Sequence, residues 1–101
     1  MNVARKLTTG LPECDYTPPK YKGPSREEAL EMRRQYVNPA IFHIYKEPLM
    51  IVDGHKQYLF DETGRRYLDL FAGIVTVSCG HSHPKIIAKT KEQIDHIQHT
   101  A

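Results

Sequence analysis

The sequence predicts an α+β fold with two helices and a three-stranded antiparallel meander. A capping-box pattern opens the first helical segment and a proline opens the second. Between them lie short runs of β-branched and aromatic residues, separated by glycine-containing turns. A free-standing domain closes its elements around one core, and this chain of 101 residues has few residues left to cover its apolar segments. The sequence is therefore interpreted as a fragment of a larger fold.

Residues 1–24 are expected to form an extended arm. They contain little apolar content and four prolines, at Pro12, Pro18, Pro19 and Pro24. Tyr16 and Tyr21 could anchor the arm on another surface, or they could be exposed in a flexible tail. Both alternatives are open from the sequence.

The first helix is expected to start after Ser25 and to end near Tyr36. The Ser25 hydroxyl can accept a hydrogen bond from the Glu28 backbone, and the Glu28 carboxylate can reach back to Ser25. Helix-forming residues follow this cap. The helix should stop there because Pro39 disfavours helical backbone at Asn38.

Three strands are predicted next, at residues 49–52, 57–61 and 66–70. The pair Asp53–Gly54 is a hairpin-turn signal because both residue types tolerate positive φ. Residues 62–64 give the second turn. Tyr58 and Phe60 are interpreted as sheet packing.

The segment 71–79 is apolar or small throughout, which predicts a buried crossing segment. Pro84 suits the first turn of a second helix, expected to run to about Gln98. One face of that helix carries an apolar stripe of Ile87, Ile94 and Ile97.

Bulk composition excludes several classes of partner. The net charge of +2 is too small to indicate nucleic acid or an anionic membrane surface. No apolar run approaches the roughly 20 residues that span a bilayer. Cys14 and Cys79 are interpreted as reduced thiols of an intracellular protein. Residues 1–11 contain Arg5 and Lys6 but no acidic residue, which is weakly similar to the end of an organelle transit peptide.

A motif pattern runs from Leu49 to His99. It comprises Gly54, Tyr58-Leu59-Phe60-Asp61, Gly64, Tyr67-Leu68-Asp69, Gly73-Ile74-Val75-Thr76-Val77 and Gly80-His81-Ser82-His83-Pro84. Together these motifs resemble the opening of the class III, pyridoxal-phosphate-dependent aminotransferases. Within that family, the stretch Phe71–Val77 is most similar to the mitochondrial alanine–glyoxylate aminotransferase subgroup.

The resemblance implies the amino-terminal part of a fold-type-I enzyme, a homodimer that holds pyridoxal phosphate at its subunit interface. Such enzymes transfer an amino group from an amino acid to a keto acid. The subgroup implies alanine as donor and glyoxylate or pyruvate as acceptor, in the mitochondrion, with the cytoplasm as the alternative. Residues 25–101 would supply an incomplete amino-terminal portion of the small domain and the start of the crossing segment and helix.

The resemblance also implies two substrate-binding residues. Ile74 matches a position near the bound substrate, and Gly73 stands where the backbone must come close. The alternatives are that Gly73 is only a tight packing point and Ile74 only a core residue. Asp69 could be a general base by residue type, but its place in a predicted strand favours a structural hydrogen bond.

No catalytic or cofactor-binding residue is expected in this chain. The family's Schiff-base lysine lies far downstream, and none of the lysines after the arm's Lys6 has that context: Lys20, Lys22, Lys46, Lys56, Lys85, Lys89 and Lys91. The chain alone is therefore expected to be inactive. The alternative function is a truncated, non-catalytic interaction module that binds a full-length subunit.

A metal site is not expected either. His81 with His83, and His96 with His99, are close enough in sequence to be ligand pairs, and Cys79 could add a donor. Their spacing fits no familiar zinc pattern, and the first pair is explained by the helix-start motif.

Overall fold

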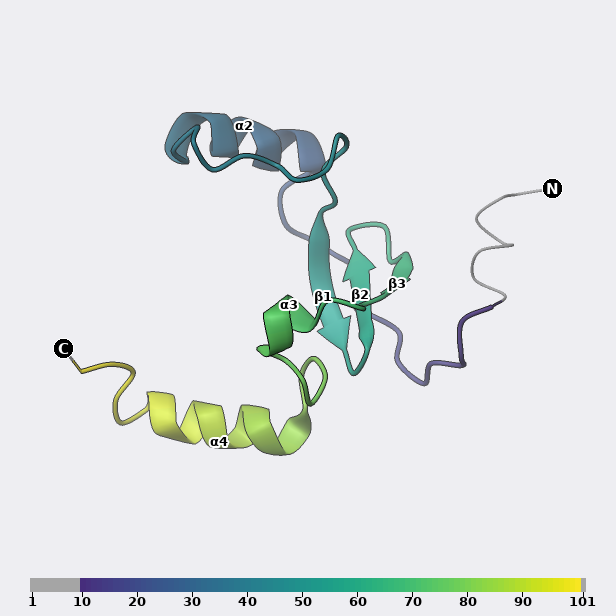
Figure 1. Cartoon of the computed structure of the whole chain (residues 1–101), viewed down its shortest axis with the longest axis vertical. Coiled ribbons are helices and arrows are strands. Elements are labelled where there is room, and N and C mark those ends of the chain that lie inside the picture. Colours follow the sequence, from purple (N-terminus) through teal and green to yellow (C-terminus); the bar gives the residue numbers. More distant parts are fainter. Residues whose placement is uncertain (1–9, 101) are drawn as a thin grey trace. The chain divides into compact units, whose positions relative to one another are not determined.

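The computed structural model describes residues 10–100. Its elements, shown in Figure 1, are α2 (Arg26–Tyr36), β1 (Ile51–His55), β2 (Tyr58–Asp61), β3 (Arg66–Leu68), α3 (Ala72–Val75) and α4 (Pro84–Ile94). The strands form one antiparallel sheet in the order β1-β2-β3. This confirms the α+β class and adds one short helix, α3, to the two expected. The transit-peptide interpretation falls mainly on residues 1–9, outside the described residues.

Contacts divide the chain into two compact units that both draw on the sheet. One unit comprises the residues up to Asp53 together with Phe60–Arg66. The other comprises Gly54–Leu59 together with the residues from Tyr67 onward. The first unit contains α2, and the second contains α3 and α4.

Helix α2 begins at the predicted cap. The Glu28 N–H donates to Ser25 Oγ at 3.1 Å, and the Ser25 N–H donates to Glu28 Oε2 at 2.7 Å. The backbone N–H of Ser25, and after it the Ser25 side chain, hold the pKa of the Glu28 carboxyl below its usual value. The helix ends at Tyr36, where Val37 takes an extended conformation. The predicted capping box and the predicted end of the helix near Tyr36 are therefore both confirmed.

The predicted turn at Asp53–Gly54 is wrong. Strand β1 continues through both residues to His55, and the chain reverses at Lys56 and Gln57. Gly54 is needed for a different reason, because a Cβ atom there would lie 2.9 Å from the His81 side chain. Lys56 takes the positive φ of 52° that the reversal requires.

The most buried side chains lie on β2. Tyr58 is 1% exposed, Phe60 2% and Asp61 4%. Hydrogen bonds compensate for the cost of burying the Asp61 carboxylate. Its Oδ1 accepts from the Thr63 N–H, the Thr63 hydroxyl and the Arg65 N–H. Tyr58 and Phe60 therefore pack in the sheet as predicted, and Asp61 organises the turn that leads to β3.

Residues 10–24 contain no helix or strand, and Tyr16 anchors this segment within its own unit. The Tyr16 hydroxyl donates to Asp53 Oδ2 at 2.7 Å, and its ring lies 5.7 Å from the Phe60 ring, centroid to centroid. The hydrogen bond to the Asp53 carboxylate raises the pKa of Tyr16. Of the two alternatives for Tyr16, the anchoring one is confirmed.

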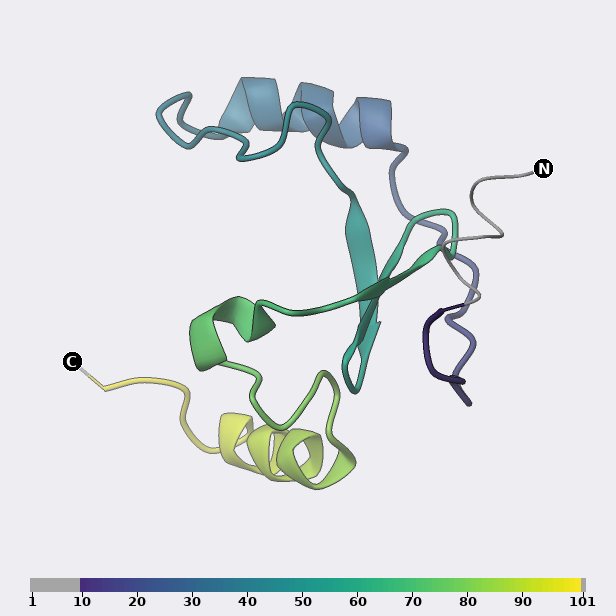
Figure 2. The ribbon, with the colours of Figure 1, turned by 45° about the vertical axis from the view of Figure 1, so that its right-hand side comes forward.

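The segment 71–79 is not buried in this chain, contrary to expectation. Phe71, Ile74 and Val75 are all exposed, because nothing among residues 10–100 packs over them. In Figure 2 the chain passes from α3 through a looping connection into α4. Helix α4 ends at Ile94, about one turn earlier than predicted. Ile87 and Ile94 on this helix and Ile97 beyond its end are exposed.

None of the helices described between residues 10 and 100 is long and apolar enough to cross a membrane.

Candidate functional site

The short element α3 is a left-handed turn. Its four residues have positive φ values: 50° at Ala72, 59° at Gly73, 55° at Ile74 and 62° at Val75. Left-handed backbone costs about 1–2 kcal/mol for each residue other than glycine, and it is especially unusual for β-branched residues. Three of the four residues here carry that cost, so surrounding contacts must hold the turn in this conformation.

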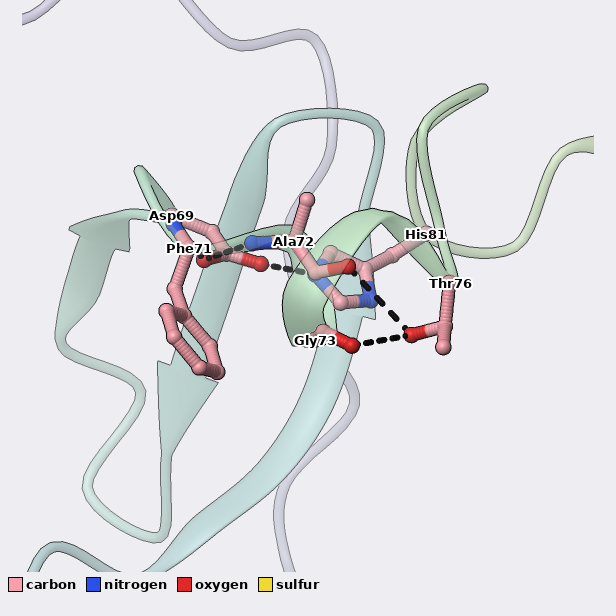
Figure 3. Close-up of polar contacts among 6 residues, drawn as sticks. All are labelled: Asp69, Phe71, Ala72, Gly73, Thr76 and His81. Carbon is pink, nitrogen blue, oxygen red and sulfur yellow. Dashed lines mark hydrogen bonds and ion pairs between the residues drawn. The ribbon is translucent and has the colours of Figure 1, made fainter.

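The carboxylate of Asp69 holds the entry to the turn (Figure 3). Its Oδ1 accepts hydrogen bonds from the backbone N–H of Phe71 at 2.9 Å and of Ala72 at 3.0 Å. The other oxygen, Oδ2, lies 2.7 Å from His81 Nε2. The Ala72 N–H, then His81, then the Phe71 N–H lower the pKa of the Asp69 carboxyl. Asp69 is therefore ionised near neutral pH, with its side chain only 9% exposed.

His81 connects this carboxylate to the β1–β2 hairpin. Because an ionised carboxylate only accepts hydrogen bonds, His81 Nε2 carries the shared proton. The His81 backbone exchanges two hydrogen bonds with Lys56, at 2.7 and 2.9 Å. Its ring passes over Gly54, where no larger residue would fit. The histidine is thus fixed at its backbone and at its ring.

Thr76 holds the exit of the turn. Its hydroxyl is directed at the carbonyl oxygens of Gly73, at 2.9 Å, and Ala72, at 3.3 Å. A Cβ atom added to Gly73 would lie 2.3 Å from Thr76 Oγ1. Gly73 is therefore required both by its φ of 59° and by its close neighbour.

The turn exposes the apolar side chain of Ile74 next to the backbone of Gly73. Ile74 is 72% exposed, and Gly73 next to it is exposed as well. The two residues predicted as substrate-binding therefore lie together on one exposed turn. Both oxygens of Asp69 are already engaged, which disfavours the general-base alternative and agrees with a structural hydrogen-bonding role.

Sequence reasoning named Asp69 and His81 within one motif but did not pair them. They lie 12 residues apart, and no local spacing rule predicts that contact. Thr76 was likewise recognised only as part of the motif. One sequence feature could have indicated these residues: Asp69, Thr76 and His81 are polar residues that lie within a short, otherwise apolar segment around Gly73.

The lysines of the described residues lie on the surface of this segment. A Schiff-base lysine works from a desolvated and oriented position. All seven lysines between residues 10 and 100 are exposed, and Lys89 is paired with Glu92 at 2.6 Å. Over the same range, no three side chains of histidine, cysteine, aspartate or glutamate gather as a metal site. Cys14 and Cys79 are both free thiols.

The sequence of residues 42–101, more than half of the chain, matches the family described as aminotransferase class III. The chain belongs to the class III aminotransferases. The left-handed turn and its supporting residues all lie inside the matched region.

Three relatives illustrate the similarity. The chain is 53% identical over 89 residues to alanine–glyoxylate aminotransferase 2 homolog 2, mitochondrial, of Arabidopsis thaliana, covering 88% of this chain and 19% of that protein. It is 40% identical over 91 residues to the Homo sapiens alanine–glyoxylate aminotransferase 2, mitochondrial, covering 90% and 18%. A solved ornithine aminotransferase from Toxoplasma gondii matches with a TM-score of 0.60 and 32% identity, covering 75% of this chain and 17% of that one.

These coverages mean that the chain spans about a fifth of the length of the relatives that it matches. The solved Toxoplasma enzyme is described with partial occupancy of pyridoxal phosphate at its active site. The structural matches confirm that the fold is the one found in the corresponding part of pyridoxal-phosphate aminotransferases.

Proposed function

We propose that this segment supplies the substrate-facing turn of a class III aminotransferase that uses alanine as amino donor and glyoxylate or pyruvate as acceptor. The observation that carries the proposal is the exposed left-handed turn of Ala72–Val75, held from both ends. Ile74 would form an apolar wall of the substrate pocket, and Gly73 would let the substrate approach the backbone. The names of the Arabidopsis and human relatives support the choice of substrates.

Pyridoxal phosphate would be the cofactor of the complete enzyme, where it serves as the electron sink for amino-group transfer. No lysine of this segment has the sequence context of the family's Schiff-base lysine. We therefore place the cofactor lysine outside this segment and expect the 101-residue chain alone to be inactive. Incubation with pyridoxal phosphate, alanine and glyoxylate should give no turnover above the buffer blank.

The remaining assignments are proposals that rest on the same family membership. Residues 1–24 would form an arm, and residues 25–101 would belong to the small domain and the start of the crossing segment. The complete enzyme would be a homodimer. The names of the relatives support a mitochondrial location.

The decisive test is the substitution Ile74→Trp, made in a complete enzyme. A suitable host is the Arabidopsis relative with its matching segment replaced by the sequence of this chain. If Ile74 lines the substrate pocket, the indole fills that pocket, so kcat/KM falls while the melting temperature changes little. Steady-state kinetics and a thermal melt on the same preparation measure both quantities.

The alternative is that Ile74 becomes a packed core residue in the complete enzyme. Overpacking then costs typically about 1–3 kcal/mol, and the melting temperature falls while the folded fraction stays fully active. That pattern would remove Ile74 from the substrate site. Ile97→Trp, at an exposed isoleucine beyond α4, is the control for adding an indole to this segment.

A second candidate function is a non-catalytic module that binds a full-length subunit. The exposed isoleucines of α4 favour it, because they offer an apolar face without cover among the described residues. Mixing the chain with the Arabidopsis enzyme and measuring co-elution by size exclusion tests this function. Separate elution at micromolar concentrations would rule it out.

A further inference from the structure

We propose that Asp69 is a positioning residue of the enzyme: supported by His81, it keeps the turn Ala72–Val75 left-handed and so fixes where Gly73 and Ile74 meet the substrate. This inference rests on the proposed function of that turn. It assigns to Asp69 no contact with substrate or cofactor. Asp69 acts only through its hydrogen bonds to the backbone N–H groups of Phe71 and Ala72.

The need for such a residue follows from the backbone conformation. Ala72, Ile74 and Val75 all adopt positive φ, although none of them is glycine. A segment of these residues released from its contacts relaxes toward right-handed or extended backbone. The turn's own hydrogen bonds, such as Ile74 N–H to the Phe71 carbonyl at 3.1 Å, do not select the left-handed form by themselves.

Asp69 holds the backbone at the entry of the turn. A single oxygen, Oδ1, receives the N–H groups of both Phe71 and Ala72, at 2.9 and 3.0 Å. Two consecutive N–H groups can converge on one acceptor only if the backbone between them is oriented accordingly. Hydrogen bonds to an ionised acceptor are also stronger than those between neutral groups. The carboxylate therefore fixes the two peptide planes on either side of Phe71, from which the left-handed turn starts.

His81 holds the Asp69 carboxylate in position. Its Nε2 engages the second oxygen of Asp69 at 2.7 Å, which leaves the carboxylate no freedom to rotate away from the turn. The ring is held against Gly54, and the backbone of His81 is paired with Lys56. The turn is thereby held in place relative to Gly54 and Lys56, which lie in the same compact unit.

The experiment uses the same chimeric holoenzyme and a pair of substitutions. Asp69→Ala removes the acceptor, and we expect kcat/KM for alanine and glyoxylate to fall about 10- to 100-fold, as for a displaced positioning group. Ala72→Gly, combined with Asp69→Ala, removes the steric cost of positive φ at the first turn residue. The double variant should recover most of the lost kcat/KM. Asp95→Ala, at an exposed aspartate after α4, is the matched control and should leave the kinetics unchanged.

The rescue distinguishes positioning from general support of the fold, because a lost fold contact is not restored by a glycine in the turn. Asp69→Asn is the folded reference, since its amide oxygen can still accept both N–H groups. It should lose about tenfold or less, because neutral hydrogen bonds replace charge-assisted ones. If Asp69→Ala yields no folded enzyme, Asp69→Leu, which fills a similar space without an acceptor, is compared with and without Ala72→Gly.

Two results would overturn the inference. One is a loss of activity in Asp69→Ala that Ala72→Gly does not restore, and the other is wild-type activity in Asp69→Ala itself. In the second case, a low kcat/KM for Ile74→Trp shows that the proposed function of the turn survives. If Ile74→Trp is also fully active, the proposed function itself fails.

Discussion

At the scale of single residues, the site depends on polar groups that hold the backbone rather than on groups that react. Asp69 uses both oxygens, and Thr76 directs its hydroxyl at two carbonyl groups of the turn. Gly73 and Ile74 could be named from the resemblance of their motif, because a motif preserves sequence order. The pairing of Asp69 with His81 could not, because it depends on how the chain folds back over the β1–β2 hairpin.

The ionised state of Asp69 makes the turn sensitive to acid. Its folded-state pKa lies below the usual value, so its stabilising contribution is complete above the unfolded value of about 3.9 and is lost as pH falls through the folded pKa. The amide signal of Phe71 should therefore shift with a midpoint below pH 3.8, the reference value for aspartate. Selective 15N-phenylalanine labelling of the dilute chain gives only three amide signals to follow.

The Phe42 amide, in the loop after α2, provides the internal reference for that titration. In the Asp69→Asn variant the Phe71 shift should disappear, because the side chain no longer titrates. A Phe71 midpoint at or above the ordinary aspartate value would show that the hydrogen bonds at the turn do not stabilise the carboxylate.

At the scale of elements, local rules predicted helix α2 well and the hairpin poorly. The cap at Ser25 and the stop before Pro39 depend only on neighbours in sequence. The Asp53–Gly54 signal failed because Gly54 makes room for His81, a residue far away in the chain. The reversal falls instead at Lys56 and Gln57, which carry no turn signal of their own.

The cap of α2 can be tested through Ser25→Ala. Loss of the hydroxyl leaves the Glu28 N–H without its acceptor and should cost about 1 kcal/mol of helix stability. Amide hydrogen exchange within α2 should therefore become about fivefold faster, while exchange in α4 stays the same. Ser78→Ala, at an exposed serine, is the control and should change neither helix. Equal exchange rates in wild type and Ser25→Ala would show that the capping box contributes nothing.

At the scale of the whole molecule, far more large apolar side chains are exposed than buried among the described residues. Only Tyr58, Phe60 and Asp61 are buried among the described residues. The apolar content of segment 71–79 predicted burial, but none of the other described elements covers this segment. Burial depends on partners, which a local pattern does not specify.

We therefore expect the isolated chain to self-associate through α4. Its exposed isoleucines form the kind of apolar patch that drives association. Sedimentation should show an average mass that rises with concentration. Replacing Ile87 and Ile94 together with glutamine should weaken association more than about tenfold, because each buried isoleucine contributes about 1.5–3 kcal/mol.

The matched control changes Lys85 and Lys91, on the same helix, to glutamine. Both lysines are exposed, so association should persist in this variant. A monomer at all concentrations, with a sharp and concentration-independent thermal transition, would contradict the prediction.

The contact between Gly73 and Thr76 also restricts the order in which this segment can change during evolution. A new side chain at position 73 meets Thr76 Oγ1 at 2.3 Å, so it is blocked while the threonine is present. Loss of the threonine first removes the hydroxyl that holds the Ala72 and Gly73 carbonyl groups. Either single change therefore weakens the turn, and because the φ of 59° disfavours a side chain at position 73 even without the threonine, Gly73 should be retained in related sequences in which Thr76 has changed.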